Sequence, residues 1–263
     1  MTIKLLKYEL RSSAVLMGIV WAATILTSIM TTLFTGSMLN SDSALVQLLG
    51  GLPVFLFAVA CVAMAVGMVF IIVIRFYQSL LGDEGYLMHT LPVKEWQHIT
   101  AKGLSATIYT LGCAVVLFIA VAIFSKGAII VEVAKVFPTL AKHPVYILYA
   151  IEAFIVGIFG ILKSVYSVYA SMAVGQLADK HRILLSVAAY IGLGFVISVG
   201  ATVFILLGVN LTDKVAFFNP LTQMINFGSI QFLIISAFLI ELAQVALFHV
   251  ITERILTKSL NLL

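Results

Sequence analysis

The sequence predicts an all-α, polytopic membrane protein with six transmembrane helices. Hydrophobic residues make up 62% of the 263 positions and charged residues only 10%, whereas a soluble domain averages about 45–50% apolar and about 25% charged residues. Six segments also reach the roughly 20 apolar residues that a helix needs to cross the hydrocarbon core of a bilayer. The lipid bilayer is therefore the expected environment of the chain, and no basic patch interleaved with aromatic residues indicates a nucleic-acid partner.

The six predicted spans follow one another with short connections. They cover residues 14–37, 52–75, 103–124, 145–174, 183–208 and 229–252. The first is longer than the core of a secretory signal and is followed by five similar runs, so we interpret it as a retained span. The second follows the helix breakers Gly50, Gly51 and Pro53. Because no connection is large enough for a soluble domain, residues 1–263 are predicted to form a single transmembrane domain.

Lysine and arginine residues are unevenly divided between the two sides of the predicted membrane. An even number of spans puts both termini on one side, and that side carries ten of these residues. The other side carries four, namely Lys126, Lys135, Lys142 and Lys214. Because cytoplasmic connections carry an excess of Lys and Arg, both termini are expected in the cytoplasm.

The residues before the first span show helical periodicity on two faces. The apolar positions are Ile3, Leu6 and Leu10, and the basic positions are Lys4, Lys7 and Arg11. This pattern predicts an N-terminal amphipathic helix that lies in the membrane interface. It is compatible with a positive anchor that only fixes topology and with an elbow helix that contacts a cytoplasmic partner.

The connection between the second and third spans is the most informative part of the sequence. Gly82 interrupts the preceding helix, Asp83 is a good N-cap for a short helix, and Pro92 ends that helix. The short helix exposes aromatic and flexible apolar groups, which bury well in a groove of another protein. These groups are Tyr86, Leu87, Met88 and Leu91. The alternative is an interfacial helix that only lies on lipid.

Three segments carry a resemblance to a known family. They are residues 82–93 (GDEGYLMHTLPV), 169–184 (YASMAVGQLADKHRIL) and 252–262 (TERILTKSLNL). They resemble, in order, two cytoplasmic loops and the C-terminal tail of bacterial ABC transporter permeases of the six-span exporter class. The resemblance covers the chain nearly from end to end.

The resemblance implies a role and a set of partners. The chain would form half of a dimeric membrane core in the bacterial cytoplasmic membrane, together with a second copy or a homologous permease. A separate ATPase dimer, carrying ATP and Mg²⁺, would push on a coupling helix in the connection between the second and third spans. The implied contacts with the ATPase are Asp83, Glu84, Tyr86, Leu87, Met88, His89 and Leu91.

The chain itself is expected to be non-catalytic and to hold no cofactor or metal. A phosphate-binding loop needs a Gly-Lys pair, and no such pair occurs in the sequence. No recognisable catalytic motif occurs either, and the five histidines show no metal-ligand spacing. Cys61 and Cys113 both fall in apolar runs and are interpreted as packing residues rather than a disulfide.

Three charged residues lie within predicted spans, namely Glu152, Lys163 and Glu241. Counted from the cytoplasmic ends of their spans at 1.5 Å per residue, Lys163 and Glu241 lie at a similar depth of roughly 18–20 Å. We therefore predict that they meet or share a polar cavity, with Gln244 one turn from Glu241. Glu152, near the start of its span, is expected to reach the outer interface. Ser164, Ser167 and Ser171 extend a polar strip along the fourth span.

Two interpretations of these charges stay open. They form either a structural ion pair that fixes helix packing or a gate or site that contacts substrate. They are also compatible with a different class of protein, an ion-driven secondary transporter or channel, which needs a polar site near the bilayer midplane. Such transporters often contain matched helices interrupted by Gly or Pro, and we find no such pair here. The sequence does not identify a substrate.

Overall fold

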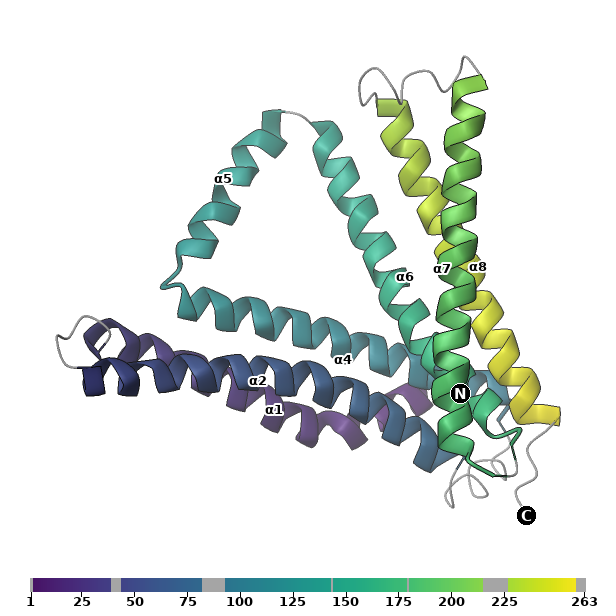
Figure 1. Cartoon of the computed structure of the whole chain (residues 1–263), viewed down its shortest axis with the longest axis horizontal. Helices are drawn as coiled ribbons and strands as arrows, with labels where there is room; N and C mark the ends of the chain where they lie inside the picture. Colours follow the sequence, from purple (N-terminus) through teal and green to yellow (C-terminus); the bar gives the residue numbers. More distant parts are fainter. Residues whose placement is uncertain are drawn as a thin grey trace. The chain divides into compact units, whose positions relative to one another are not determined.

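The structure, a computed structural model, describes residues 2–38, 44–81, 93–142, 144–178, 180–214 and 227–258. Every regular element in these ranges is a helix (Figure 1), which confirms the predicted all-α class. The elements are α1 (Thr2–Met38), α2 (Ala44–Phe76), the π-helix η1 (Tyr77–Leu81), α4 (Glu95–Phe124), α5 (Ala128–Lys142), α6 (Pro144–Gly175), α7 (Arg182–Lys214) and α8 (Phe227–Lys258).

Within the described ranges, six helices are long and apolar enough to cross a membrane. They are α1, α2, α4, α6, α7 and α8, and they correspond to the six predicted spans. The helices extend beyond the predicted limits. For example, α4 already begins at Glu95, about two turns before the predicted start of the third span.

The N-terminal residues continue into the first span without a break, because α1 is one helix from Thr2 to Met38. Residues 2–13 therefore do not form a separate elbow helix in this structure. Arg75 at the end of α2 donates two hydrogen bonds of 2.6 Å to the side chain and the carbonyl of Ser12. The Tyr109 hydroxyl of α4 donates to the Leu10 carbonyl. These bonds attach the start of α1 to both neighbouring helices.

Helix α2 differs from the prediction at its start. It begins at Ala44 and passes through Gly50, Gly51 and Pro53, which were expected to precede the span. Proline removes one backbone hydrogen bond from a helix, but a segment in hydrocarbon has no water to satisfy the backbone groups that an unwound helix would expose. Continuing the helix through Pro53 therefore costs less free energy than unwinding it. In addition, the Thr31 hydroxyl of α1 donates to the Pro53 carbonyl at 2.7 Å.

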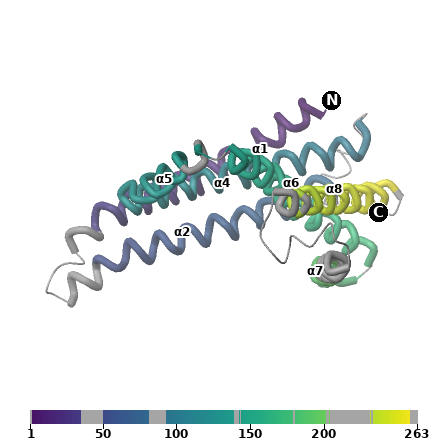
Figure 2. Tube along the Cα trace, turned by 90° about the horizontal axis from the view of Figure 1, so that it is seen from above, coloured from purple at the N-terminus to yellow at the C-terminus, as the bar shows by residue number. Residues whose placement is uncertain are grey.

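The contacts of the chain divide it into two compact units, which are described separately. The first contains residues Met1–Arg75 and Leu104–Ile147. In this unit α2 runs back along α1 (Figure 2). Helix α4 runs parallel to α1, because successive α1 residues bond to successive α4 residues. The core between the three helices consists of Met17, Met64, Met68, Tyr109, Cys113 and Val116.

Buried hydroxyl groups on α1 reinforce this packing. Thr24, Ser28 and Thr31 recur at helical spacing and are at most 1% exposed. Ser28 donates to the Ala120 carbonyl of α4 at 2.5 Å, and Thr31 bonds to α2 as described above. Small hydroxyl residues allow close approach of transmembrane helices and supply hydrogen bonds between them. Helix α1 is therefore the element that ties α2 and α4 together.

A tight turn separates α4 from α5. Lys126 and Gly127 have positive φ angles of 51° and 83°. The Gly127 amide donates to the Ala122 carbonyl at 2.9 Å, and the Lys126 amide donates to the Ile123 carbonyl at 3.0 Å. This pair of bonds is the Schellman motif that closes many helices. The segment 126–144, expected only to lie outside the membrane, thus contains a 15-residue helix.

The second unit contains residues Phe76–Gly103 and Leu148–Leu263. Its best-packed part brings together the end of α2, η1, the start of α4, α6 and α8. Side chains there that are completely buried, at 0% exposure, are Phe76, Leu80, Ile99, Ala170, Ala173, Phe248 and Thr252. Helix α7 packs closely on the end of α6, where a Cβ atom at Gly175 would lie 1.8 Å from the Ser186 hydroxyl oxygen.

The packing of α1 against α4 gives a first prediction. A Cβ atom added at Gly112 would lie 2.6 Å from the Trp21 ring, whereas one added at Gly67 would meet nothing within 4 Å. Gly112→Ala should therefore destabilise the protein by about 1–3 kcal/mol through overpacking. Gly67→Ala, the matched control, should be neutral or slightly stabilising because alanine favours helix. Thermal unfolding in detergent, followed by tryptophan fluorescence, measures both, and equal unfolding temperatures for the two variants would contradict this packing.

Candidate functional site

The residues implied as ATPase contacts, from Asp83 to Leu91, lie outside the described residues. Their role stays a prediction. The structure does describe the chain immediately before and after them. It also describes all four residues predicted to form an intramembrane polar site, so the site is built here from these two regions of the second unit.

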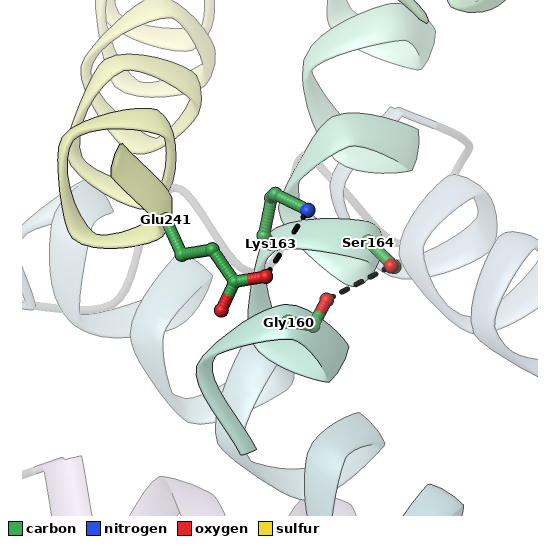
Figure 3. Close-up of polar contacts among 4 residues, drawn as sticks. All are labelled: Gly160, Lys163, Ser164 and Glu241. Carbon is green, nitrogen blue, oxygen red and sulfur yellow. Dashed lines mark hydrogen bonds and ion pairs between the residues drawn. The ribbon is translucent and has the colours of Figure 1, made fainter. Parts of the chain in front are cut away.

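Helices α6 and α8 carry the predicted ion pair. Lys163 Nζ lies 3.3 Å from Glu241 Oε1 (Figure 3). The side chains are 31% and 18% exposed, so the pair is largely removed from the surface. The prediction that these two residues meet is confirmed. The similar depth that suggested it corresponds to a direct contact between two candidate spans.

A second polar pair joins the same two helices. The Gln231 side-chain amide of α8 donates to Glu152 Oε1 of α6. Glu152, expected to reach the outer interface, thus has a partner on a neighbouring helix. The sequence analysis did not identify Gln231. The sequence does indicate this pairing, however, because Gln231 precedes Glu241 by about the same number of residues as Glu152 precedes Lys163.

These contacts share one register and define a seam between parallel helices. A third contact, between the Phe159 and Phe238 rings, has a centroid distance of 5.0 Å and an edge-to-face angle of 82°. The three pairs join residues that are 79, 79 and 78 positions apart in the sequence. We call this set, Glu152–Gln231, Phe159–Phe238 and Lys163–Glu241, the α6–α8 seam. A constant offset means that α6 and α8 run in the same direction, as the fourth and sixth spans of one chain must.

Gly160 leaves room for the Glu241 carboxylate in the α6–α8 seam. A Cβ atom at Gly160 would lie 3.1 Å from Glu241 Oε1, so a larger residue would displace the carboxylate. The Ser164 hydroxyl next to it donates back to the Gly160 carbonyl at 2.9 Å (Figure 3). Ser167 and Ser171 likewise donate to carbonyls of their own helix. The predicted polar strip is thus present on α6, but its hydroxyl protons are used within that helix.

The polar residues of this region have more acceptors than donors. Four buried oxygen atoms have no hydrogen-bond partner, namely Glu152 Oε2, Gln231 Oε1, Glu241 Oε2 and Gln244 Oε1. Burying a polar atom without a partner costs free energy, so these atoms would gain from a hydrogen-bond donor. Within the ranges that the structure describes, no group of His, Cys, Asp and Glu side chains is arranged to hold a metal ion.

Elsewhere in the second unit, aromatic side chains connect α2, α6 and α8. The Phe76 ring at the end of α2 stacks on Tyr169 of α6, with centroids 4.1 Å apart. Tyr166 lies edge-on to Tyr169 at 6.1 Å and edge-on to His249 of α8 at 5.3 Å. We call Phe76, Tyr166, Tyr169 and His249 the aromatic cluster. Edge-to-face and offset-stacked rings attract one another beyond the area that they bury.

The start of α4 joins the same cluster. A Cβ atom at Gly103 would lie 2.8 Å from the Tyr166 hydroxyl oxygen, so the α4 backbone packs directly against this side chain. Segment 82–92 therefore lies in the chain between Phe76 and Gly103, and both of these residues contact α6. This cluster was not predicted from the sequence, because its members are distributed over three helices that are distant in the chain.

Comparisons with protein-family models, curated proteins and solved structures found no match for this chain. Three features of the molecule itself therefore bear on its function. These are the six candidate spans, the α6–α8 seam and the aromatic cluster.

The ion pair can be tested by a double-mutant cycle. Lys163→Gln or Glu241→Gln alone leaves the opposite charge without its partner, which should cost about 2–3 kcal/mol. The double variant leaves no unpaired charge, so its loss should be clearly smaller than the sum of the single losses. Unfolding by SDS titration in mixed micelles measures each variant.

A surface ion pair of the same chain provides the matched control for this cycle. Glu132 and Lys135 are 2.5 Å apart, but their side chains are 68% and 64% exposed. Exposed pairs contribute little because water and salt screen them. The same two glutamine substitutions at these positions should therefore give no measurable coupling. Additive losses at Lys163 and Glu241 would show that their contact is not an energetic pair.

Proposed function

We propose that this chain is the membrane-spanning permease subunit of an ABC transporter of the exporter class, in a bacterial cytoplasmic membrane with both termini in the cytoplasm. Six candidate spans and three segments that resemble such permeases support this proposal. The chain carries no phosphate-binding loop, which fits a subunit whose ATPase partner binds ATP and Mg²⁺. Its membrane partner is a second copy or a homologous permease.

The observation that carries the proposal is the anchoring of segment 82–92 at both of its ends. Before it, Phe76 stacks on Tyr169 and Leu80 is completely buried. After it, Ile99 is completely buried and Gly103 packs against the Tyr166 side chain. A segment held in this way transmits a push from a partner protein to the helices that hold it, because close-packed interiors transmit strain.

The proposed mechanism follows from these contacts. Closure of the ATPase dimer pushes segment 82–92, and the displacement reaches α6 at Tyr169 and Tyr166. The Tyr166–His249 contact passes it to α8. The α6–α8 seam is therefore the place where a movement of the ATPase alters contacts between spans. Its nearest member to the cluster is the Lys163–Glu241 pair, because Lys163 lies less than one turn from Tyr166 on α6.

The seam has one of two roles within this function. It either fixes α6 on α8 or contacts the substrate during transport. The four oxygen atoms without donors favour contact with a substrate that donates hydrogen bonds. Charge-neutral variants at Lys163 and Glu241 separate the roles, since loss of assembly indicates the structural role and intact assembly with altered transport indicates substrate contact.

One observation favours a second candidate function, an ion-driven secondary transporter or channel. Glu152, Lys163 and Glu241 all lie within candidate spans, and charged residues in such segments commonly mark ion or proton pathways. This function needs no ATPase. The two candidates therefore differ in a property that can be measured directly.

Co-purification from the native host tests the leading function. We expect a tagged chain to bring an ATPase with it, and the purified complex to hydrolyse ATP. Leu87→Asp should weaken this association by about tenfold or more, because it places a charge in an apolar contact worth at least about 1.4 kcal/mol. Leu177→Asp, an exposed position in the connection between α6 and α7, is the matched control and should retain the ATPase.

Two results would contradict this assignment. Isolation of the wild-type chain without any ATPase, together with transport that persists in ATP-depleted vesicles, would favour the secondary transporter. Wild-type association of the Leu87→Asp variant would remove segment 82–92 from the contact with the ATPase while leaving the transporter class intact.

The aromatic cluster gives a further prediction. Tyr169→Leu removes the ring that stacks on Phe76 and keeps an apolar side chain. It should leave the ATPase bound, but it should reduce the ATP-dependent change in labelling of a cysteine placed at Leu242 of α8. A loss of about 1 kcal/mol for an aromatic pair corresponds to about a fivefold smaller shift in the equilibrium. Tyr190→Leu on an exposed face of α7 is the control, and equal behaviour of the two variants would exclude transmission through the cluster.

A further inference from the structure

Helix α5 has an apolar face that is exposed. Ile129, Val133 and Phe137 recur at intervals of four residues, which places them on one side of the helix. Ile130 and Val136 flank them. The exposed fractions are 64% for Phe137, 54% for Ile130, 51% for Val136 and 41% for Val133. A contiguous exposed apolar surface marks a contact with another phase or molecule.

The opposite side of α5 is polar. Lys135 donates to Glu132 at 2.5 Å, and Lys142 follows two turns after Lys135 on the same side. Val131 also lies on this side, about 160° around the helix from Val133 at 100° per residue. The helix thus separates its apolar and charged residues as interfacial membrane helices do.

Both ends of α5 are tied to candidate spans. Helix α4 ends at Phe124, and α5 begins at Ala128. At the other end, α5 stops at Lys142, and α6 begins at Pro144. Connections this short reach at most about 10–15 Å. Because successive spans cross the bilayer in opposite directions, both ends of α5 are held close to the same surface of the membrane.

The span that precedes α5 in the chain also exposes apolar side chains. Within the first unit, Val115, Phe118 and Phe124 of α4 are exposed, and they belong to a candidate span. An apolar side chain exposed on a transmembrane helix faces lipid unless another protein covers it. The apolar face of α5 begins at Ile129, five residues after Phe124, so it follows closely in the chain on a span whose exposed side chains are apolar.

We propose that α5 lies in the interfacial layer of the bilayer. Its face of Ile130, Val133 and Phe137 enters the boundary between headgroups and acyl chains, and its Glu132–Lys135 pair faces water. The occupant of the apolar face is lipid rather than a second copy of the chain, because two short tethers hold this 15-residue helix at the membrane surface. This inference depends on the membrane-spanning helices and does not require an ATPase partner.

Two valines allow a closely matched test. Val131→Cys and Val133→Cys are prepared separately in a Cys61→Ala, Cys113→Ala background, labelled with a nitroxide and placed in phosphatidylcholine–phosphatidylglycerol nanodiscs at one chain per disc. Collision rates with oxygen and with a water-soluble nickel chelate are measured by electron paramagnetic resonance. The Val133 label should meet oxygen preferentially and the Val131 label the nickel chelate. The depth difference should approach the helix diameter of about 10 Å.

Two results would overturn the proposal. Equal and high access of the nickel chelate to both labels would place α5 in water. Protection of the Val133 label from both reagents would mean that protein covers the apolar face.

A second measurement avoids the background substitutions, since Cys113 accepts a hydrogen bond from Trp21 and its loss alters the core. In the otherwise unchanged chain, a water-soluble maleimide should modify Val131→Cys about tenfold faster than Val133→Cys, which corresponds to about 1.4 kcal/mol of protection. Equal rates at the two positions would contradict the interfacial placement.

Discussion

The structure depends on one constraint, namely that polar groups inside a bilayer must find partners within the protein. This constraint makes every regular element in the described ranges helical, since a helix satisfies its own backbone. It also explains why α2 continues through Pro53, where an aqueous segment would end. The same requirement decides how side chains are used. Ser28 donates across to α4, whereas Ser164 donates back to its own helix.

The two units differ in the kind of polar contact that joins their helices. In the first unit, hydroxyl groups of α1 form neutral hydrogen bonds to α2 and α4, and the methionine-rich core fills the space around them. In the second unit, α6 and α8 meet through charged and amide side chains that leave acceptor oxygens without donors. A contact whose groups are incompletely satisfied loses less when it is exchanged for another contact. The α6–α8 seam is therefore the better candidate for a part that rearranges.

The sequence predicted what depends on local properties. Hydropathy located the six spans, and a rise of 1.5 Å per residue placed Lys163 level with Glu241. The role of Gln231 and the aromatic cluster were not predicted, because they depend on the register between helices that are distant in the chain. Helix α5 was not predicted for a different reason. The spacing of Ile129, Val133 and Phe137 is visible in the sequence, but the segment is too short to span a membrane and contains Pro138. The role of residues 82–92 stays a prediction.

The aromatic cluster and the Lys163–Glu241 ion pair belong to one interface between α6 and α8. A displacement can therefore pass from the cluster to the ion pair. Tyr166 follows Lys163 by three residues on α6, or about 4.5 Å of helix rise, and it contacts His249 on α8. A displacement entering at Phe76 therefore arrives at the same two helices, less than one turn from Lys163 on α6 and about two turns from Glu241 on α8. Because α6 and α8 run parallel, a sliding of one along the other changes all three pairs of the seam together. Under the proposed function, a push on segment 82–92 thus produces a single shift between α6 and α8, and this shift regroups the buried charges of the seam.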